Sequence, residues 1–206
     1  MPTPSLAAIV LAGGQSRRMG RDKALIAIEG VPLLRRVCDV ALRCTPIVYV
    51  ITFRPEQYRS LLPLHCHLIQ EYALLGETKS HGPLIGFAQA LEHLQRETVQ
   101  TCWVLLLACD MPCLSGETLQ HWVNKLEHVG DAIALLPRTQ KGWEPLCGFY
   151  RTSCLSRLQA AIERGDRSFQ RWLAQESVKE LPIDDHHMLF NCNTPQDLTG
   201  LVRSEE

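Results

Sequence analysis

Short apolar runs alternate with longer amphipathic runs along most of this chain. The apolar runs are β-branched or continuously hydrophobic, which is typical of buried strands. They cover Ala7–Leu11, Ile47–Thr52, His67–Gln70, Val104–Ala108 and Ala132–Leu136. The segments between them have helical spacing and cover Pro32–Arg43, Glu56–Leu62, Pro83–Leu94 and Gly116–Glu127. Pro32 and Pro83 stand where the first turn of a helix tolerates proline, and Ser115 is suited to cap the fourth helix.

This alternation of strands and helices favours an α/β fold with three layers, in which helices cover both faces of a mostly parallel sheet. The last third predicts a strand over Leu146–Tyr150 and helices over Ser153–Glu163 and Ser168–Gln175. A final helix is expected to open at Thr194-Pro195, a capping residue followed by proline. We therefore expect a mixed sheet and one domain over residues 1–206, without a second independent core.

Composition excludes several classes of protein. The 206 residues carry a formal net charge of −1, which argues against binding nucleic acid by bulk electrostatics. The dense apolar run from Trp103 to Cys109 is too short to cross a bilayer, and the N-terminus lacks the positive charge of a signal peptide. Nine cysteines without a Cys-x-x-Cys pair indicate reduced, mostly buried thiols. These features predict a cytoplasmic protein without a membrane or nucleic-acid partner.

The strongest candidate for chemistry is the loop after the first strand. Gly13 and Gly14 would let the backbone turn and present N–H groups to an anion. Four cations follow closely, at Arg17, Arg18, Arg21 and Lys23. Backbone donors combined with cations suit a polyphosphate, and a solvated basic loop is the alternative. The spacing matches neither the P-loop nor the dinucleotide-binding fingerprint.

The run from Leu11 to Lys23, Leu-Ala-Gly-Gly-Gln-Ser-Arg-Arg-Met-Gly-Arg-Asp-Lys, resembles the signature of the molybdenum cofactor guanylyltransferases. These enzymes are nucleotidyltransferases with a Rossmann-like fold. The resemblance continues at Gly82–Gly86, Ala108–Pro112, Pro145-Leu146, Gly148–Arg151 and Asn191–Leu198, and so spans nearly the whole chain. It implies a nucleotide-binding part over about residues 1–113 and an acceptor-binding part over about residues 114–206.

Asp110 closes a continuously apolar strand and is followed by Pro112. A carboxylate there either forms an Asx-turn or holds a metal ion, and a polyphosphate loop in the same sheet favours the metal. The resemblance implies that Asp110 binds Mg²⁺ and that Arg18 and Lys23 stabilise developing negative charge. It also implies a nucleotide site that includes the following residues: Leu11, Ala12, Gly13, Gly14, Lys23, Gly82, Pro83, Leu84 and Asp110.

The implied reaction joins GMP from GTP to molybdopterin or molybdenum-molybdopterin and releases pyrophosphate. A terminal phosphate of the acceptor attacks the α-phosphorus, and because this nucleophile is already anionic, the reaction needs no general base. A cytidylyltransferase for the same cofactor, a transferase for another phosphorylated acceptor and a nucleotide-binding regulator without turnover remain alternatives. Other cofactor-biosynthesis proteins and molybdoenzymes are possible partners.

Five further features carry weaker signals. Glu71 follows the third strand, where the resemblance implies an acidic residue that reads the guanine edge; relatives usually carry aspartate there, and an exposed loop glutamate is the alternative. The stretch Ile51-Thr-Phe53 also departs from the family, which often has a nucleotide-contacting asparagine.

Asn191 and Asn193 either cap the next helix or, by resemblance, line the acceptor site. Asp184–His187 has the composition of a metal cluster but is expected to solvate a loop, and Trp143 and Glu144 are only possible neighbours of the acceptor.

Overall fold

A computed structural model describes residues 5–13, 22–73, 82–97, 99–193 and 197. Its strands are β1 (Leu6–Leu11), β2 (Ala27–Ile28), β3 (Val31–Pro32), β4 (Val48–Thr52), β5 (Cys66–Gln70), β6 (Trp103–Ala108), β7 (Ala134–Thr139), β8 (Gly142–Trp143), β9 (Cys147–Arg151) and β10 (Val178–Leu181). Its α-helices are α1 (Leu33–Leu42), α2 (Pro55–Tyr58), α3 (Pro83–Arg96), α4 (Gly116–Val123), α5 (Leu155–Glu163) and α6 (Phe169–Leu173). Short 3₁₀ turns are η1 (Lys23–Leu25), η2 (Arg59–Leu61), η3 (Leu126–His128), η4 (Thr152–Cys154) and η5 (His186–Leu189).

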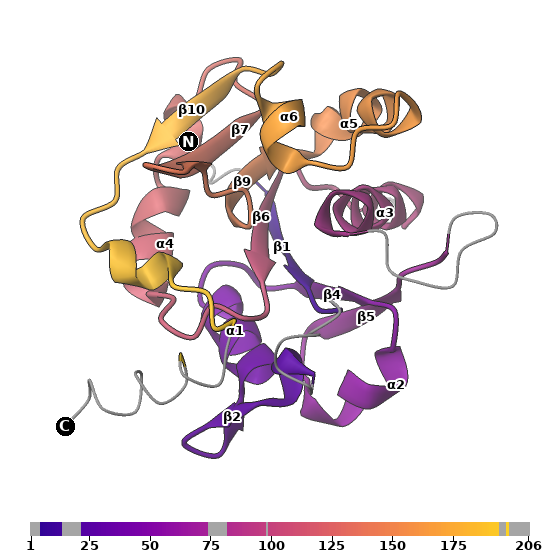
Figure 1. Ribbon diagram of the computed structural model, residues 1–206, viewed down its shortest axis with the longest axis vertical. Helices are drawn as coiled ribbons and strands as arrows, with labels where there is room; N and C mark the ends of the chain where they lie inside the picture. Colours follow the sequence, from indigo (N-terminus) through magenta and orange to yellow (C-terminus); the bar gives the residue numbers. More distant parts are fainter. Residues whose placement is uncertain (1–4, 14–21, 74–81, 98, 194–196, 198–206) are drawn as a thin grey trace.

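One eight-stranded sheet organises the molecule, in the order β10-β7-β9-β6-β1-β4-β5, with β8 paired to β7 (Figure 1). The β1 strand lies parallel between β4 and β6, and β5 extends this parallel part. The β9 strand runs antiparallel between β6 and β7. The sheet is therefore mixed and mostly parallel, as the sequence predicted, and the carboxyl ends of β1, β4, β5 and β6 meet at one edge.

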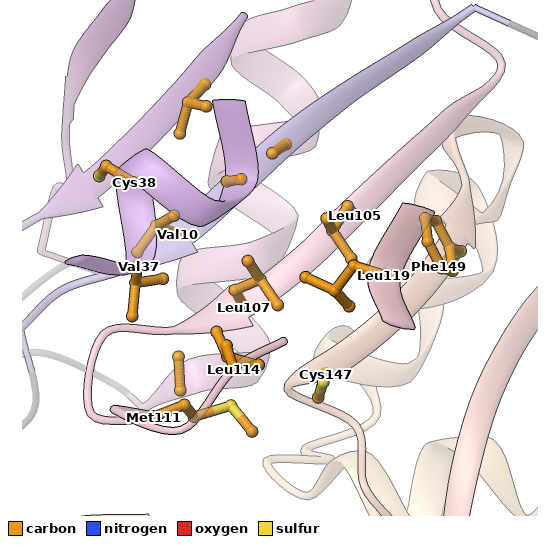
Figure 2. Packing of buried hydrophobic residues seen from close by; sticks show 14 of the residues in the cluster. Val10, Val37, Cys38, Leu105, Leu107, Met111, Leu114, Leu119, Cys147 and Phe149 are labelled. Carbon is orange, nitrogen blue, oxygen red and sulfur yellow. The ribbon is translucent and has the colours of Figure 1, made fainter. Parts of the chain in front are cut away.

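Two apolar layers cover the two faces of this sheet. Alternate residues of β1 face opposite layers: Ala8 and Val10 belong to one, Ala7 and Ile9 to the other. The first layer contains side chains from α1 and α4, and the second contains side chains from α3, α5 and α6. Figure 2 shows part of the first layer, where Val10, Leu105 and Leu119 are among the buried side chains. The fold thus has the three layers that the sequence predicted.

Two helix starts were predicted correctly from their local chemistry. The Ser115 hydroxyl accepts a hydrogen bond from the Thr118 N–H at 3.1 Å and caps α4. Pro83 is the first residue of α3, preceded by Gly82 with φ of +95°, a conformation that favours glycine. Within the described ranges, none of the helices combines the length and apolarity that a membrane span needs.

Several helix and strand boundaries predicted from the sequence were wrong. Pro32 pairs in β3, so α1 begins one residue later, at Leu33. The helix expected over Glu56–Leu62 is a single α-helical turn followed by the 3₁₀ turn η2, and the one expected over Gly116–Glu127 leaves α-helical geometry after Val123. The β10 strand was missed because its sequence, Val-Lys-Glu-Leu, contains no apolar run. The helix expected to open at Thr194-Pro195 starts outside the described residues.

Candidate functional site

A cavity of about 220 Å³ lies where the carboxyl ends of the parallel strands meet, and we call it the carboxyl-edge cavity. Open α/β sheets bind ligands in this position. Its lining comes from the ends of β1, β4 and β6, from the segment after β5, and from η1 and α3. The lining residues are Leu11, Ala12, Gly13, Asp22, Lys23, Ile51, Glu71, Gly82, Pro83, Gly86, Ala108, Cys109, Asp110 and Leu146.

Lys23 and Asp110 form an ion pair in the cavity wall. The Lys23 ammonium lies 2.9 Å from the Asp110 carboxylate, and the two side chains are only 16% and 18% exposed. The pairing of β1 with β6 aligns Leu11 with Ala108 and so brings the loops after both strands together. The structure therefore places side by side the cation and the carboxylate that the sequence singled out separately. We call Lys23 and Asp110 the ionic end of the cavity.

The Asn191–Asn193 segment is attached to this ionic end. The Cys192 N–H donates to the Asp110 carbonyl at 2.8 Å, and the Lys23 ammonium donates to the Asn193 side-chain oxygen at 2.6 Å. The Asn191 amide instead donates to the Leu189 carbonyl within its own segment. Of the two asparagines, Asn193 therefore contacts the ionic end directly.

Glu71 defines a second region of the cavity. Its N–H donates to the Thr52 carbonyl at 2.8 Å, and the residue is only 6% exposed. The alternative of an exposed loop glutamate is therefore wrong. A Cβ on Gly86 would lie 3.8 Å from Leu11 and 4.0 Å from the Glu71 carboxyl carbon. Gly86 thus lies beside both residues, and we call Leu11, Glu71 and Gly86 the Glu71 end of the cavity.

The end of β1 forms the floor between the two regions. The Ala12 N–H donates to the Ile51 carbonyl at 3.0 Å, and the Cys109 N–H donates to the Leu11 carbonyl at 3.2 Å. The backbone of Gly13 does not adopt positive φ, and a Cβ there would meet neighbouring atoms only at an ordinary distance of 3.6 Å. The described backbone of Gly13 would therefore also accept a residue with a side chain. Gly14 and Arg18 lie outside the described residues.

The start of α3 forms a wall of the cavity, in part as expected. Gly82 and Pro83 line it, and so does Gly86 one turn later. Leu84 does not line the cavity. It is 1% exposed, and its side chain packs in the apolar layer that also contains Phe87. One segment thus begins a helix and bounds the cavity at the same time.

Sequence reasoning missed six lining residues as individual candidates: Asp22, Ile51, Gly86, Ala108, Cys109 and Leu146. All except Ile51 lay within motifs already recognised. Asp22 holds the turn that carries Lys23, since its carboxylate accepts from the Ala24 N–H at 3.0 Å and from the Tyr58 hydroxyl at 2.5 Å. Nothing in the sequence pattern linked Tyr58 to this loop.

Cys109 lines the cavity next to Asp110. Burial, followed by the negative charges of Asp110 and Asp22, raises its pKa well above the usual range of a thiol. Cys109 therefore stays protonated at neutral pH and is unsuited to act as a nucleophile. Five of the nine cysteines are buried, as the composition predicted.

The remaining candidates lie elsewhere. Asp185 caps η5 by accepting from the His187 N–H at 2.8 Å, and the described part of the chain contains no cluster of three or more metal-binding side chains. The Arg138 guanidinium lies over Trp143 at 5.1 Å, and Glu144 accepts from the Thr139 hydroxyl at 3.1 Å. Neither Trp143 nor Glu144 lines the carboxyl-edge cavity.

Comparison with known proteins identifies the family. A family model described as a MobA-like NTP transferase domain matches residues 8–180. The chain is 52% identical to a probable molybdenum cofactor guanylyltransferase from Nostoc sp. over 94% of this chain and 89% of the relative. A relative of the same description from Synechococcus elongatus is 41% identical over 97% of this chain and 100% of the relative.

A solved structure shares the fold. The crystal structure of molybdopterin-guanine dinucleotide biosynthesis protein A from Archaeoglobus fulgidus superposes with a TM-score of 0.74 at 26% identity and covers 97% of this chain and 100% of that chain. Fold, cavity position, family model and relatives agree. The chain therefore belongs to the family of MobA-like NTP transferases and is a nucleotidyltransferase.

Proposed function

We propose that this chain transfers GMP from GTP to molybdopterin, forms the guanine dinucleotide of the cofactor and releases pyrophosphate. The observation that carries the proposal is the Lys23–Asp110 pair in the wall of the carboxyl-edge cavity. Transfer of a nucleotidyl group needs a cation close to the phosphates and a carboxylate that can hold a metal ion. The relatives described as guanylyltransferases support the same reaction.

The two ends of the cavity suggest how GTP binds. We place the phosphates at the ionic end, with the backbone of Leu11–Gly14, and the guanine at the Glu71 end, beside Gly82 and Pro83. A buried carboxylate can accept hydrogen bonds from the N1–H and the 2-amino group of guanine, which selects this base. All lining residues of the cavity except Leu146 lie within residues 1–113, which supports the proposed nucleotide-binding part. We place the acceptor beyond Asn193, in the part formed by residues 114–206.

Asp110 fits a role as a ligand of Mg²⁺. Mg²⁺ favours one or two carboxylates together with phosphate oxygens, and Asp110 supplies one partly exposed carboxylate in the cavity wall. When bound, Mg²⁺ would neutralise negative charge on the phosphates. We place Asn191 and Asn193 at the acceptor, and Arg18 with Lys23 at the α-phosphate.

The catalytic work of the protein is to position the substrates and to neutralise charge. The attacking phosphate oxygen of the acceptor is already anionic, so no side chain has to remove a proton from it. Lys23 would stabilise the negative charge that develops as pyrophosphate leaves. The neutral Cys109 thiol and the apolar Leu11 and Ile51 would exclude water from the reacting phosphates. We place the reaction in the cytoplasm, with cofactor-biosynthesis proteins and molybdoenzymes as partners.

Pyrophosphate release tests the proposal. The purified protein would be incubated with Mg²⁺ and intact molybdopterin, and GTP, CTP, ATP and UTP would be offered separately. We expect release with GTP alone. Release with CTP would overturn the guanine assignment and leave a cytidylyltransferase. No release with any nucleotide, with acceptor verified as intact, would overturn the reaction and favour another acceptor or a binding protein without turnover.

A further inference from the structure

We infer that Tyr58 is a positioning residue for Lys23: through its hydrogen bond to Asp22, it fixes the turn that directs the Lys23 ammonium toward Asp110. The inference deepens the proposed function, because it rests on the placement of the phosphates at the ionic end. It assigns a role to a buried polar group that lies outside the motifs of the chain.

The Tyr58 hydroxyl is held in place by its surroundings. Tyr58 is the last residue of α2 and is 1% exposed, with its ring in the apolar layer beside α1. Its hydroxyl donates to one carboxylate oxygen of Asp22 at 2.5 Å. Burial and the Asp22 charge raise the pKa of Tyr58 well above its usual range, so the hydroxyl stays protonated and remains a donor at every pH suited to an assay.

Asp22 transmits this contact to the turn of Lys23. Its second carboxylate oxygen accepts from the Ala24 N–H at 3.0 Å, and its carbonyl accepts from the Leu25 N–H at 3.2 Å. These bonds close η1, a 3₁₀ turn of only three residues that begins at Lys23. Because such a short turn has little stability of its own, its orientation depends on what holds its first residues.

Lys23 is thus held from both ends. Its backbone starts the turn fixed by Asp22 and Tyr58, and its ammonium lies 2.9 Å from Asp110 and 2.6 Å from Asn193. Without the Tyr58 hydroxyl, Asp22 would keep its bonds within the turn and lose its connection to α2. The turn could then shift relative to β6, and the ammonium would be positioned by its contacts to Asp110 and Asn193 alone.

The test is Tyr58→Phe, which keeps the buried ring and removes only the hydroxyl. Misplacement of a catalytic group by about 1 Å can cost up to about 100-fold in rate, so we expect kcat with GTP to fall by about 10- to 100-fold. The KM for GTP should change by less than about 3-fold, because Lys23 acts mainly on charge that develops in the transition state. Tyr49→Phe removes a hydroxyl from a buried tyrosine on β4, outside the cavity lining, and should leave both constants unchanged.

A double variant separates positioning from packing. If Tyr58 acts through Lys23, adding Tyr58→Phe to Lys23→Ala should lower kcat no further than Lys23→Ala alone does. If Tyr58 only stabilises the fold, the two losses should multiply. Full activity of Tyr58→Phe, or multiplied losses in the double variant, would overturn the inference.

A spectroscopic measurement keeps the inference distinct from the proposed function. The chain has five lysines, so ¹³C-dimethylated lysine signals can be assigned by single Lys→Arg variants. We expect the Lys23 signal to move in Tyr58→Phe and to stay in place in Tyr49→Phe. If the wild-type protein releases no pyrophosphate with any nucleotide, the proposed reaction is wrong. The Lys23 signal then still tests whether Tyr58 positions Lys23. An unchanged Lys23 signal in Tyr58→Phe would overturn the inference whatever the activity.

Discussion

The two ends of the carboxyl-edge cavity differ in charge and in burial. The ionic end joins two opposite charges, Lys23 and Asp110, that remain 16% and 18% exposed and reach each other from loops after different strands. The Glu71 end has one carboxylate in a residue that is 6% exposed, with Leu11 and Gly86 beside it. The first region depends on charge and the second on shape together with a single polar group.

This difference indicates how the two ends divide the work. Charge at a reacting phosphate changes the rate for any nucleotide, since all nucleoside triphosphates carry the same phosphates. A buried carboxylate discriminates among bases, because it accepts hydrogen bonds only from a base that presents matching donors. We therefore expect substitutions at the ionic end to lower turnover generally and substitutions at the Glu71 end to change selectivity.

The largest effect is expected from Asp110→Asn, which keeps the shape of the side chain and removes its charge. Loss of one group that stabilises charge should lower kcat on the order of 100- to 1000-fold with every nucleotide that the wild-type protein accepts. Steady-state pyrophosphate release measures this effect.

The matched control for this variant is Asp39→Asn. Asp39 also pairs with a cation, Arg35, but on the surface of α1, where the two side chains are 49% and 41% exposed. Exposed pairs contribute little, so Asp39→Asn should change kcat by less than about 2-fold and the free energy of unfolding by less than about 1 kcal/mol. Equal losses in both variants would mean that the ionic end has no special role.

A smaller, selective effect is expected from Glu71→Gln. The glutamine amide places an N–H donor where guanine also presents donors, and one lost charged hydrogen bond corresponds to about 10- to 100-fold in kcat/KM for GTP. The kcat/KM values for the other nucleotides should change much less. Glu117→Gln, an exposed carboxylate on α4, is the control for loss of charge alone. A uniform fall for all nucleotides in Glu71→Gln would contradict the division between the two ends.

The smallest effect is expected at Cys109, which lines the cavity between its two ends, and it is an effect on thiol labelling. Cys109 and Cys102 flank β6, and Cys109 is 9% exposed while Cys102 is exposed. Because burial and nearby carboxylates raise the pKa of Cys109, it should stay protonated between pH 7 and pH 9. Iodoacetamide should label Cys102 on the order of 10-fold faster or more, as measured by peptide mass spectrometry.

Activity should survive labelling at Cys102, because this residue precedes β6 and lies away from the cavity. The raised pKa of Cys109 also predicts a pH dependence of stability. Unfolded thiols ionise above about pH 8.5 while the folded Cys109 stays neutral, so the free energy of unfolding should decrease as the pH rises above this value. Rapid labelling of Cys109 at pH 7 would contradict its buried, protonated state.

The sequence predicted the parts of the fold that repeat a pattern. Runs such as Val104–Ala108 are apolar throughout because both faces of their strand are buried, so they stand out without a structure. The β10 strand lies at the edge of the sheet, and only the last of its four residues is buried, so its sequence carries no comparable signal. The helix starts with a local signal, Pro83 in α3 and Ser115 before α4, were predicted correctly.

The candidate site shows a similar limit. Motifs identified Lys23 and Asp110 separately, but their 2.9 Å contact depends on the order of strands in the sheet, which a local pattern does not contain. Glu71 is buried because its backbone is bonded to the end of β4 and α3 lies beside it. The alternative of an exposed loop glutamate was wrong because the sequence does not show these neighbours. Tyr58 could not be recognised at all, because its role depends on a contact across 36 positions of the chain.

The bond between Lys23 and Asn193 also bears on how the protein is made. It joins residues 170 positions apart, and the Cys192–Asp110 bond anchors the same late segment. During synthesis, the chain emerges from its N-terminus, so β1 and the Lys23 turn leave the ribosome long before Asn193 does. Closure of such long loops is slow relative to local folding. A chain synthesised past Asp110 but not yet to Asn193 would therefore lack the Asn193 contact to Lys23, and the finished arrangement of charges would form as one of the last steps of folding.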